Sequence, residues 1–320
     1  MDELIERGDL DELVRLVDRL VDAHDWAQLL ELAHRCRAAQ ERGRQLWPAA
    51  EHTLYRVALD GSAALACAAV TQSEGRFSLG PLTEVIASTH AWRNLEANLE
   101  PSPLAATIAH ECAIRGEDLS SAHAMREYVD VPLVLQLWEP EYPVATYSEY
   151  ALDAGAPPAT GELRRIEPRD GGEVERDRSV SDALLELVRT WTSQSNGRAR
   201  AVAVDGDAFS AITALGPRRA RAVEIHPSEA LATMAWCGAS GGARGRRRGM
   251  AAGRFDAWWA AAALADLDWP PDPDELGEAI TSLRWWRWDA HEPIGGWALQ
   301  LAIDDPESGI AWAIDAHDSV

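Results

Sequence analysis

The apolar residues of this chain change their spacing part way along it, and this change limits the folds that it can adopt. Between residues 9 and 22 they recur every three or four positions, as on one side of an α-helix. Between residues 297 and 303 they alternate, as in a strand with one buried face. A chain of 320 residues is long enough for two hydrophobic cores. We therefore expect two parts with different secondary structure.

Helix start signals recur in the first part, residues 1–130. Asp9 and Glu12 have the spacing of a capping box, and Asp25 and Gln28 repeat it. Further short helices are expected from Pro48 to Gly61 and at about 62–72, 81–88, 91–99 and 103–114. This pattern predicts an all-α, repeat-like stack of helical hairpins. No clean repeat period is present, so a solenoid and a plain helical bundle both remain open.

Residues 131–180 have a different character. The segment 131–138 is β-prone, and prolines and glycines are frequent after it. The stretch 162–178 is rich in charge and poor in apolar residues, which is typical of mobile chain. We interpret 131–180 as a connecting segment between two domains.

Residues 181–320 are expected to form an α/β domain with a mixed sheet. Strands are predicted at 199–204, 221–225, 283–288, 297–303 and 310–316, and helices at about 180–193, 207–215, from Ser228, 249–266 and 273–281. The strands 199–204 and 221–225, joined by a helix, are expected to be parallel neighbours. The last two strands should form a hairpin through the turn at 304–309.

Charge and cysteine content limit the partners and the compartment. The formal net charge is -22, which repels phosphate backbones and anionic lipid, so we expect neither nucleic acid nor a membrane as partner. All of the positive charge is arginine, because the chain has no lysine. No apolar run reaches the length of a spanning helix, and the acidic start is not a secretory signal. The four cysteines lie far apart and are interpreted as reduced, and we expect a cytoplasmic protein.

The most unusual stretch is the glycine–arginine segment, residues 238–249. It contains Gly238, Gly241 and Gly242, followed by Arg244, Arg246, Arg247 and Arg248, and it leads into a helix that carries Arg254. Backbone N–H groups at a glycine-rich helix start and nearby guanidinium groups attract anions, so these five arginines are the candidate anion-binding residues. The spacing is neither that of a P-loop nor that of a dinucleotide fingerprint. In the alternative interpretation the glycines end a helix and the arginines pair with acids such as Asp256.

Candidates for acid–base chemistry are weaker. If the first two strands of the second domain were parallel neighbours, Asp205, Asp207 and His226 would share one sheet edge, where a carboxylate beside an imidazole can move protons. The alternative is that Asp207 caps a helix and that His226, before Pro227, lies in a turn. Histidines are scattered singly, no serine or cysteine has a nucleophile motif, and no metal site or cofactor is predicted.

Tryptophan is concentrated near the end of the sequence. Nine of the fourteen tryptophans lie in residues 236–320, several of them beside arginines. Such pairs can stack bases or sugars. Trp285 and Trp286, however, are consecutive in a strand and must point to opposite faces, so only one face can line a pocket while the other packs in a core.

Three segments together resemble a family of uncharacterised actinobacterial proteins. They are the run from Trp236 through the glycine–arginine segment to Trp258 and Trp259, the run from Gly309 to Asp315, and Phe77-Ser78-Leu79-Gly80-Pro81-Leu82. The resemblance covers most of the chain. It implies an actinobacterial origin and carries over no catalytic residue, because the family has no assigned activity.

These features favour a non-catalytic binding or adaptor protein. The helical part would dock a protein partner, and the α/β part would bind a small anionic ligand or a protein. The alternative is an enzyme that acts on a phosphorylated or carboxylated metabolite, with the four arginines of 244–248 holding the anion and Asp205 or His226 moving protons. The alternative requires that these residues converge on one pocket.

Overall fold

The structure is a computed structural model that describes residues 1–320 except 74–78, 168, 170–177, 292–294 and 320. Its contacts divide the chain into two units. Unit 1 comprises Met1–Val129 and Val144–Ala154, and unit 2 comprises Asp130–Pro143 and Gly155–Val320. The segment that we interpreted as connecting structure is thus shared between the two units, and most of its charge-rich stretch lies outside the described residues.

Unit 1 is helical, as expected. Its helices are α1 (Asp2–Arg7), α2 (Leu10–Asp22), α3 (Trp26–Glu41), α4 (Trp47–Asp60), α5 (Ala63–Gln72), α6 (Leu82–Thr89), α7 (Trp92–Leu95) and α8 (Pro103–Ile114), with 3₁₀ turns η1 (Glu96–Asn98) and η2 (His123–Tyr128). The start of α2 is capped by Asp9, which accepts the N–H of Glu12 at 3.2 Å. Asp25 accepts from Gln28 at 3.2 Å in the same way. The repeat-like character of this unit stays a prediction.

A small hairpin that was not expected completes unit 1. It consists of β1 (Thr146–Tyr147) and β2 (Leu152–Asp153), which pair antiparallel. The hydroxyl of Tyr147 donates to the buried carboxylate of Glu84 at 2.6 Å, and the hydroxyl of Tyr55 donates to the carbonyl of Ser148. Tyrosine hydroxyls thus fasten the hairpin to the helices and satisfy a carboxylate that would be costly to bury alone.

Unit 2 contains a six-stranded sheet in the order β3-β5-β6-β7-β8-β4. Its strands are β3 (Arg164–Ile166), β4 (Arg198–Asp205), β5 (Ala220–Ile225), β6 (Arg284–Asp289), β7 (Trp297–Asp305) and β8 (Ile310–Asp318). Each of the five pairings between these strands is antiparallel. β7 and β8 form the expected hairpin, and β8 pairs with β4 along the whole of β4.

The strands β4 and β5 are not the parallel neighbours that we expected. They run in the same direction, but β8, β7 and β6 stand between them, so four interstrand spacings, or about 19 Å, separate them. The reason is that the C-terminal strands insert in the middle of the sheet. Local sequence pattern predicts that a strand forms, but long-range pairing decides its neighbours.

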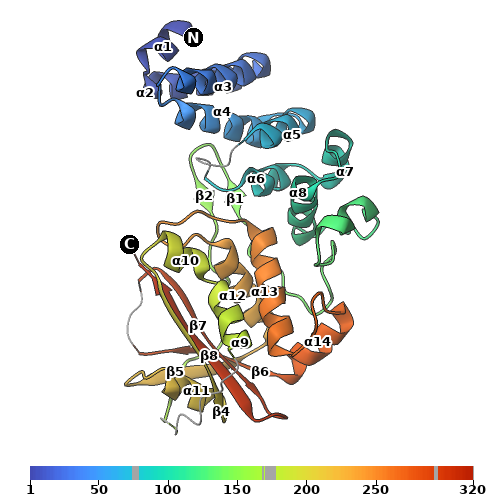
Figure 1. Ribbon diagram of the computed structural model, residues 1–320, viewed down its shortest axis with the longest axis vertical. Helices are drawn as coiled ribbons and strands as arrows, with labels where there is room; N and C mark the ends of the chain where they lie inside the picture. Colours follow the sequence, from blue (N-terminus) through green and yellow to red (C-terminus); the bar gives the residue numbers. More distant parts are fainter. Residues whose placement is uncertain (74–78, 168, 170–177, 292–294, 320) are drawn as a thin grey trace. The chain divides into compact units, whose positions relative to one another are not determined.

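Helices cover the two faces of the sheet unequally. The helices of unit 2 are α9 (Ser179–Glu186), α10 (Arg189–Gln194), α11 (Ala208–Ala214), α12 (Pro227–Ala239), α13 (Met250–Leu264) and α14 (Pro273–Ser282). Figure 1 shows α9, α12 and α13 grouped together, and α11 by itself near β4. On the face that α11 covers, Val204, Trp288, Ala302 and Ala313 form a core with the helix. Because α11 is short, the β3 end of this face is left for a pocket.

Candidate functional site

In the glycine–arginine segment, backbone N–H groups donate to the protein itself. The N–H of Ala243 donates to Asp318 Oδ2 at 2.7 Å, and the N–H groups of Arg244 and Arg246 donate to Ser195 Oγ and Gln194 Oε1 at 3.2 and 3.3 Å. Asp318 is buried. A carboxylate of the last strand therefore occupies the kind of position in which we expected the anion of a ligand.

Gly242 allows this close approach. Its φ is 69°, in the left-handed region, and a Cβ at this position would stand 2.3 Å from Asp318 Oδ2. Glycine is thus required both by the turn and by the neighbouring carboxylate. The unusual glycines of the sequence have a structural reason that involves no ligand.

The arginine side chains of the same segment differ in their surroundings. Arg244 and Arg246 are exposed, and Arg247 is half-buried. Arg248 donates to the carbonyl of Gly238 at 3.2 Å and pairs with Asp256, as the alternative interpretation of the segment holds. Burial raises the pKa of the Asp256 carboxyl above its ordinary value, and the hydrogen bond from Arg248 offsets only part of this effect.

Arg254 lies in the core of unit 2 and makes a buried ion pair with Glu139. Neither side chain is exposed, and the guanidinium donates to the carboxylate oxygens at 2.7 and 2.6 Å. The same carboxylate accepts from the indole of Trp258 at 2.8 Å and from the hydroxyl of Tyr142 at 2.6 Å. Arg254 is therefore a packing residue, and its guanidinium does not face a ligand.

This network also explains why residues 131–138 form no strand. Arg254 donates to the carbonyls of Pro132 and Val134 at 2.7 and 3.2 Å, so these backbone groups bond to a side chain and not to a neighbouring strand. Burial raises the pKa of Glu139, but the hydrogen bonds and charge of Arg254 outweigh it and bring the pKa below its ordinary value. The β-prone segment 131–138 is therefore irregular backbone held by Arg254.

The acid–base candidates are apart and hold local structure. His226 is the N-cap of α12, where its Nδ1 accepts the N–H of Ser228 at 3.2 Å. Asp207 caps α11 by accepting the N–H of Ser210 at 2.9 Å, and it pairs with Arg169. Asp205 is exposed at the end of β4, about 19 Å across the sheet from the end of β5.

The glycine–arginine segment lies at the other end of β4. Its Ala243 bonds to Asp318 in β8, and His317 beside it pairs with Arg198, the first residue of β4. Asp205 follows Arg198 by seven steps of about 3.3 Å, which is about 23 Å along the strand. The candidate anion residues and the candidate acid–base residues therefore do not meet.

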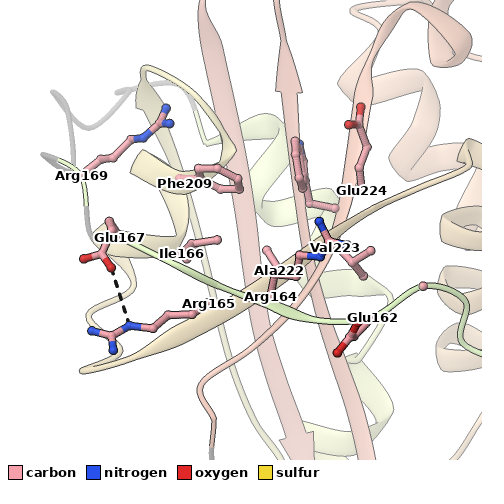
Figure 2. A pocket seen from close by; sticks show the side chains of 12 residues that line it. Glu162, Arg164, Arg165, Ile166, Glu167, Arg169, Phe209, Ala222, Val223 and Glu224 are labelled. Carbon is pink, nitrogen blue, oxygen red and sulfur yellow. Dashed lines mark ion pairs between the residues drawn. The ribbon is translucent and has the colours of Figure 1, made fainter.

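A pocket of about 700 Å³ opens on the sheet where β3, β5 and β6 lie side by side (Figure 2). Its apolar lining includes Ile166, Ala222 and Phe209. The register Arg164↔Ala222 and the alternation of side chains place Arg164 on the same face of the sheet as Ala222. This volume lies within the range of small-molecule sites.

Two aromatic rings form one wall of the pocket. Phe209 of α11 and Trp286 of β6 meet edge to face with ring centroids 4.8 Å apart. The indole N–H of Trp286 donates to Asp304 Oδ1 at 2.9 Å, and this bond fixes the orientation of its ring. Trp285, by contrast, is buried and donates to the carbonyl of Ile280. The two consecutive tryptophans thus lie on opposite faces of β6, as the alternation of side chains in a strand predicts.

Charges of both signs line the pocket, and most of them are paired. Arg165 pairs with Glu167 at 3.7 Å, the ion pair drawn as a dashed line in Figure 2, and Glu224 bonds to Arg284 at 3.2 Å. Within the described part of the chain, no ion pair is present for Arg164. Arg164 is thus the cation of this pocket that is open to a ligand's anion.

The residues of this pocket were not predicted from the sequence. Arg164, Arg165 and Arg169 fall in the stretch that we interpreted as mobile connection, and β3 is only three residues long. The alternation of Arg164 and Ile166 around Arg165 was the available signal, but it is too short to predict a strand by itself. Residues 164–166 form a strand only because they pair with β5.

The fold and the pocket define a class of protein: a helical unit joined to a unit in which helices pack on a six-stranded sheet with a ligand-sized pocket. The chain belongs to a family described as "Family of unknown function (DUF6183)", which it matches over residues 11–318. The resemblance to an uncharacterised family is thereby confirmed. No curated protein and no solved structure matches the chain.

In the part of the chain that the structure describes, none of the helices combines the length and apolarity needed to cross a membrane.

Proposed function

We propose that this protein is a non-catalytic binding protein whose unit 2 holds a small ligand with an anionic group. The observation that carries the proposal is the pocket of β3, β5 and β6, where exposed Arg164 stands beside an apolar floor and an aromatic wall. A flat apolar body would lie on Ile166 and Ala222, against the edge of Trp286. The anionic group would bond to the guanidinium of Arg164, whose planar donors match a carboxylate or a phosphate.

The same geometry favours binding over catalysis. An enzyme acting on a phosphorylated or carboxylated metabolite through Arg246, Asp205 and His226 needs these groups at one centre. The segment that carries Arg246 lies about 23 Å along β4 from Asp205, and Asp205 lies about 19 Å across the sheet from the end of β5, which His226 follows. The Nδ1 of His226 is also engaged as the N-cap of α12.

The test is ligand screening of the purified protein by thermal shift, followed by calorimetry on each hit. The panel contains nucleotides, sugar phosphates, coenzymes and aromatic carboxylates. A ligand that binds in the pocket raises the unfolding midpoint of the wild type by mass action. Replacing Arg164→Gln removes the charge and should weaken binding roughly tenfold or more, because a charge-assisted hydrogen bond contributes about 1.5–3 kcal/mol.

The matched control is Arg198→Gln, which removes an exposed arginine from the opposite edge of the same sheet. It should bind each hit as the wild type does, and both variants should unfold within about 0.5 kcal/mol of the wild type. A hit that binds Arg164→Gln with unchanged affinity contradicts the pocket assignment. Chromatography of the bound ligand separates binding from catalysis, since recovery of a changed compound would favour the enzyme.

We extend the proposal to unit 1, for which we keep the expectation of a protein partner, and to a cytoplasmic setting. Exposed apolar side chains on the helical unit, Leu10 and Tyr128 among them, support a docking role. All four cysteines are free and buried, which suits a reducing compartment. A pull-down with the full chain that returns no stoichiometric partner would count against this part of the proposal.

A further inference from the structure

The outer side of α13 carries large aromatic residues where a surface helix normally has polar ones. Phe255 and Trp259 are one helical turn apart, and they are 37% and 42% exposed. The rings of both lie 5.1 Å from that of Trp269, which follows the helix in sequence. The three residues form one surface, which we call the aromatic surface. Exposed aromatic groups of this kind are typical of protein interfaces.

The surroundings of the aromatic surface are acidic. Residues 255–283 contain seven acidic residues and no lysine, arginine or histidine. Asp266 and Asp268, which are exposed, stand next to Trp269 in sequence, and the indole of Trp269 donates to Asp130 at 3.0 Å. Of the seven acids, Asp256 is paired with Arg248, and Asp272 caps α14. The segment therefore has a net negative charge that its own residues do not balance.

Elsewhere in unit 2 aromatic rings are covered by cations of the protein. Arg169 stands over Phe209, Arg284 stands over Trp286 and Arg254 lies beside Trp258, with distances of 4.9 to 5.4 Å from guanidinium carbon to ring centroid. The aromatic surface has no basic residue in its own segment to do the same. Its electron-rich rings and its acidic rim thus both favour a cation from outside.

We propose that the aromatic surface of Phe255, Trp259 and Trp269 docks a basic, arginine-containing segment of a partner protein. A guanidinium of the partner stacks on the ring of Trp259 or Trp269, and neighbouring basic residues of the partner pair with Asp266 and Asp268. The charge of this surface complements a basic peptide and repels nucleic acid. The surface is distinct from the ligand pocket, which is lined by β3, β5, β6 and Phe209, so the two proposals stand independently.

The experiment is isothermal titration of the full chain with an end-blocked peptide of alternating glycine and arginine. The same peptide with citrulline in place of arginine has nearly the same shape without the charge. We expect the arginine peptide to bind and the citrulline peptide to bind at least tenfold more weakly. Equal binding of the two peptides, or no binding of the arginine peptide, overturns the proposal.

Variants separate docking on this surface from general attraction to an acidic protein. Phe255→Ser with Trp259→Ser removes two exposed rings, and the affinity for the arginine peptide should fall roughly tenfold, as loss of about 1.4 kcal/mol of cation–π attraction requires. Asp266→Asn with Asp268→Asn should weaken binding at low salt more than at high salt. The matched control, Asp11→Asn with Asp22→Asn, removes the same charge from exposed positions of unit 1 and should change little.

If the ring variant fails to fold, which its circular dichroism will show, the aspartate variant and its control still decide the question. Equal loss in these two variants means unspecific attraction and contradicts the proposal. Sedimentation analysis tests whether the aromatic surface is instead occupied by a second copy of the chain. A dimer of the wild type that dissociates in the ring variant would mean that a second copy covers the surface, and the proposal of a basic partner would be wrong.

Discussion

The two arginine-containing segments of unit 2 differ in what surrounds their side chains. In residues 244–254, Arg248 pairs with Asp256 and Arg254 with Glu139, and the N–H of Ala243, just before this segment, donates to Asp318. In residues 164–169, Arg164 is exposed at a pocket without an ion pair among the described residues. Residues 244–254, which are the more unusual in sequence, thus have a structural role. Density of arginine and glycine indicates where guanidinium groups are, but only the fold decides which of them are free.

The largest effect that tests this difference is expected at Arg254. Replacing Arg254→Met leaves the buried carboxylate of Glu139 without its counter-charge and should destabilise the protein by about 3–5 kcal/mol. Chemical denaturation measures this loss. The double variant with Glu139→Leu should lose less than the sum of the two single variants, because the unpaired charge is then gone. Additive losses, or a loss below about 1 kcal/mol, would contradict the structural role of this arginine.

A smaller effect of the same sign is expected at Arg248. Its guanidinium is half-buried and bonds to Asp256 and to the carbonyl of Gly238, so Arg248→Met should cost about 1–3 kcal/mol. Arg244→Met is the matched control, because Arg244 is exposed and has no ion pair among the described residues, and it should cost under about 0.5 kcal/mol. Equal costs would erase the distinction that we draw between paired and exposed arginines of this segment.

How far the sequence predicts this structure follows from the range of the interactions involved. The capping residues Asp9 and Ser102 act within three residues, so the helices that they start were predicted. The division between Trp285 and Trp286 follows from the alternation of a single strand. The separation of β4 from β5 depends on β6, β7 and β8, which lie far along the chain, and no local pattern contains it. The pocket was missed for the same reason, since β3 is a strand only beside β5.

The smallest expected effect is the difference in pKa shift between the acidic partners of the two ion pairs, Glu139 and Asp256. The pKa of Glu139 lies below its ordinary value of about 4.3, so its ionisation stabilises the folded state above that pH, and this stability is lost as the pH falls through the folded pKa. The pKa of Asp256 lies above its ordinary value of about 3.9, so the folded state holds the proton more tightly and the sign is opposite.

Carboxyl-carbon NMR of the full chain measures both groups in one experiment. We expect the pKa of Glu139 to lie below the ordinary value of a glutamate and the pKa of Asp256 to lie above the ordinary value of an aspartate. The opposite directions follow from the partners: five hydrogen bonds, two of them from Arg254, stabilise the ionised carboxylate of Glu139, whereas burial dominates at Asp256. Arg248→Met should move the Asp256 titration still higher and leave that of Glu139 in place. A pKa of Glu139 at or above its ordinary value would mean that the Arg254 network is weaker than its geometry indicates, and the contrast between the two segments would then rest on exposure alone.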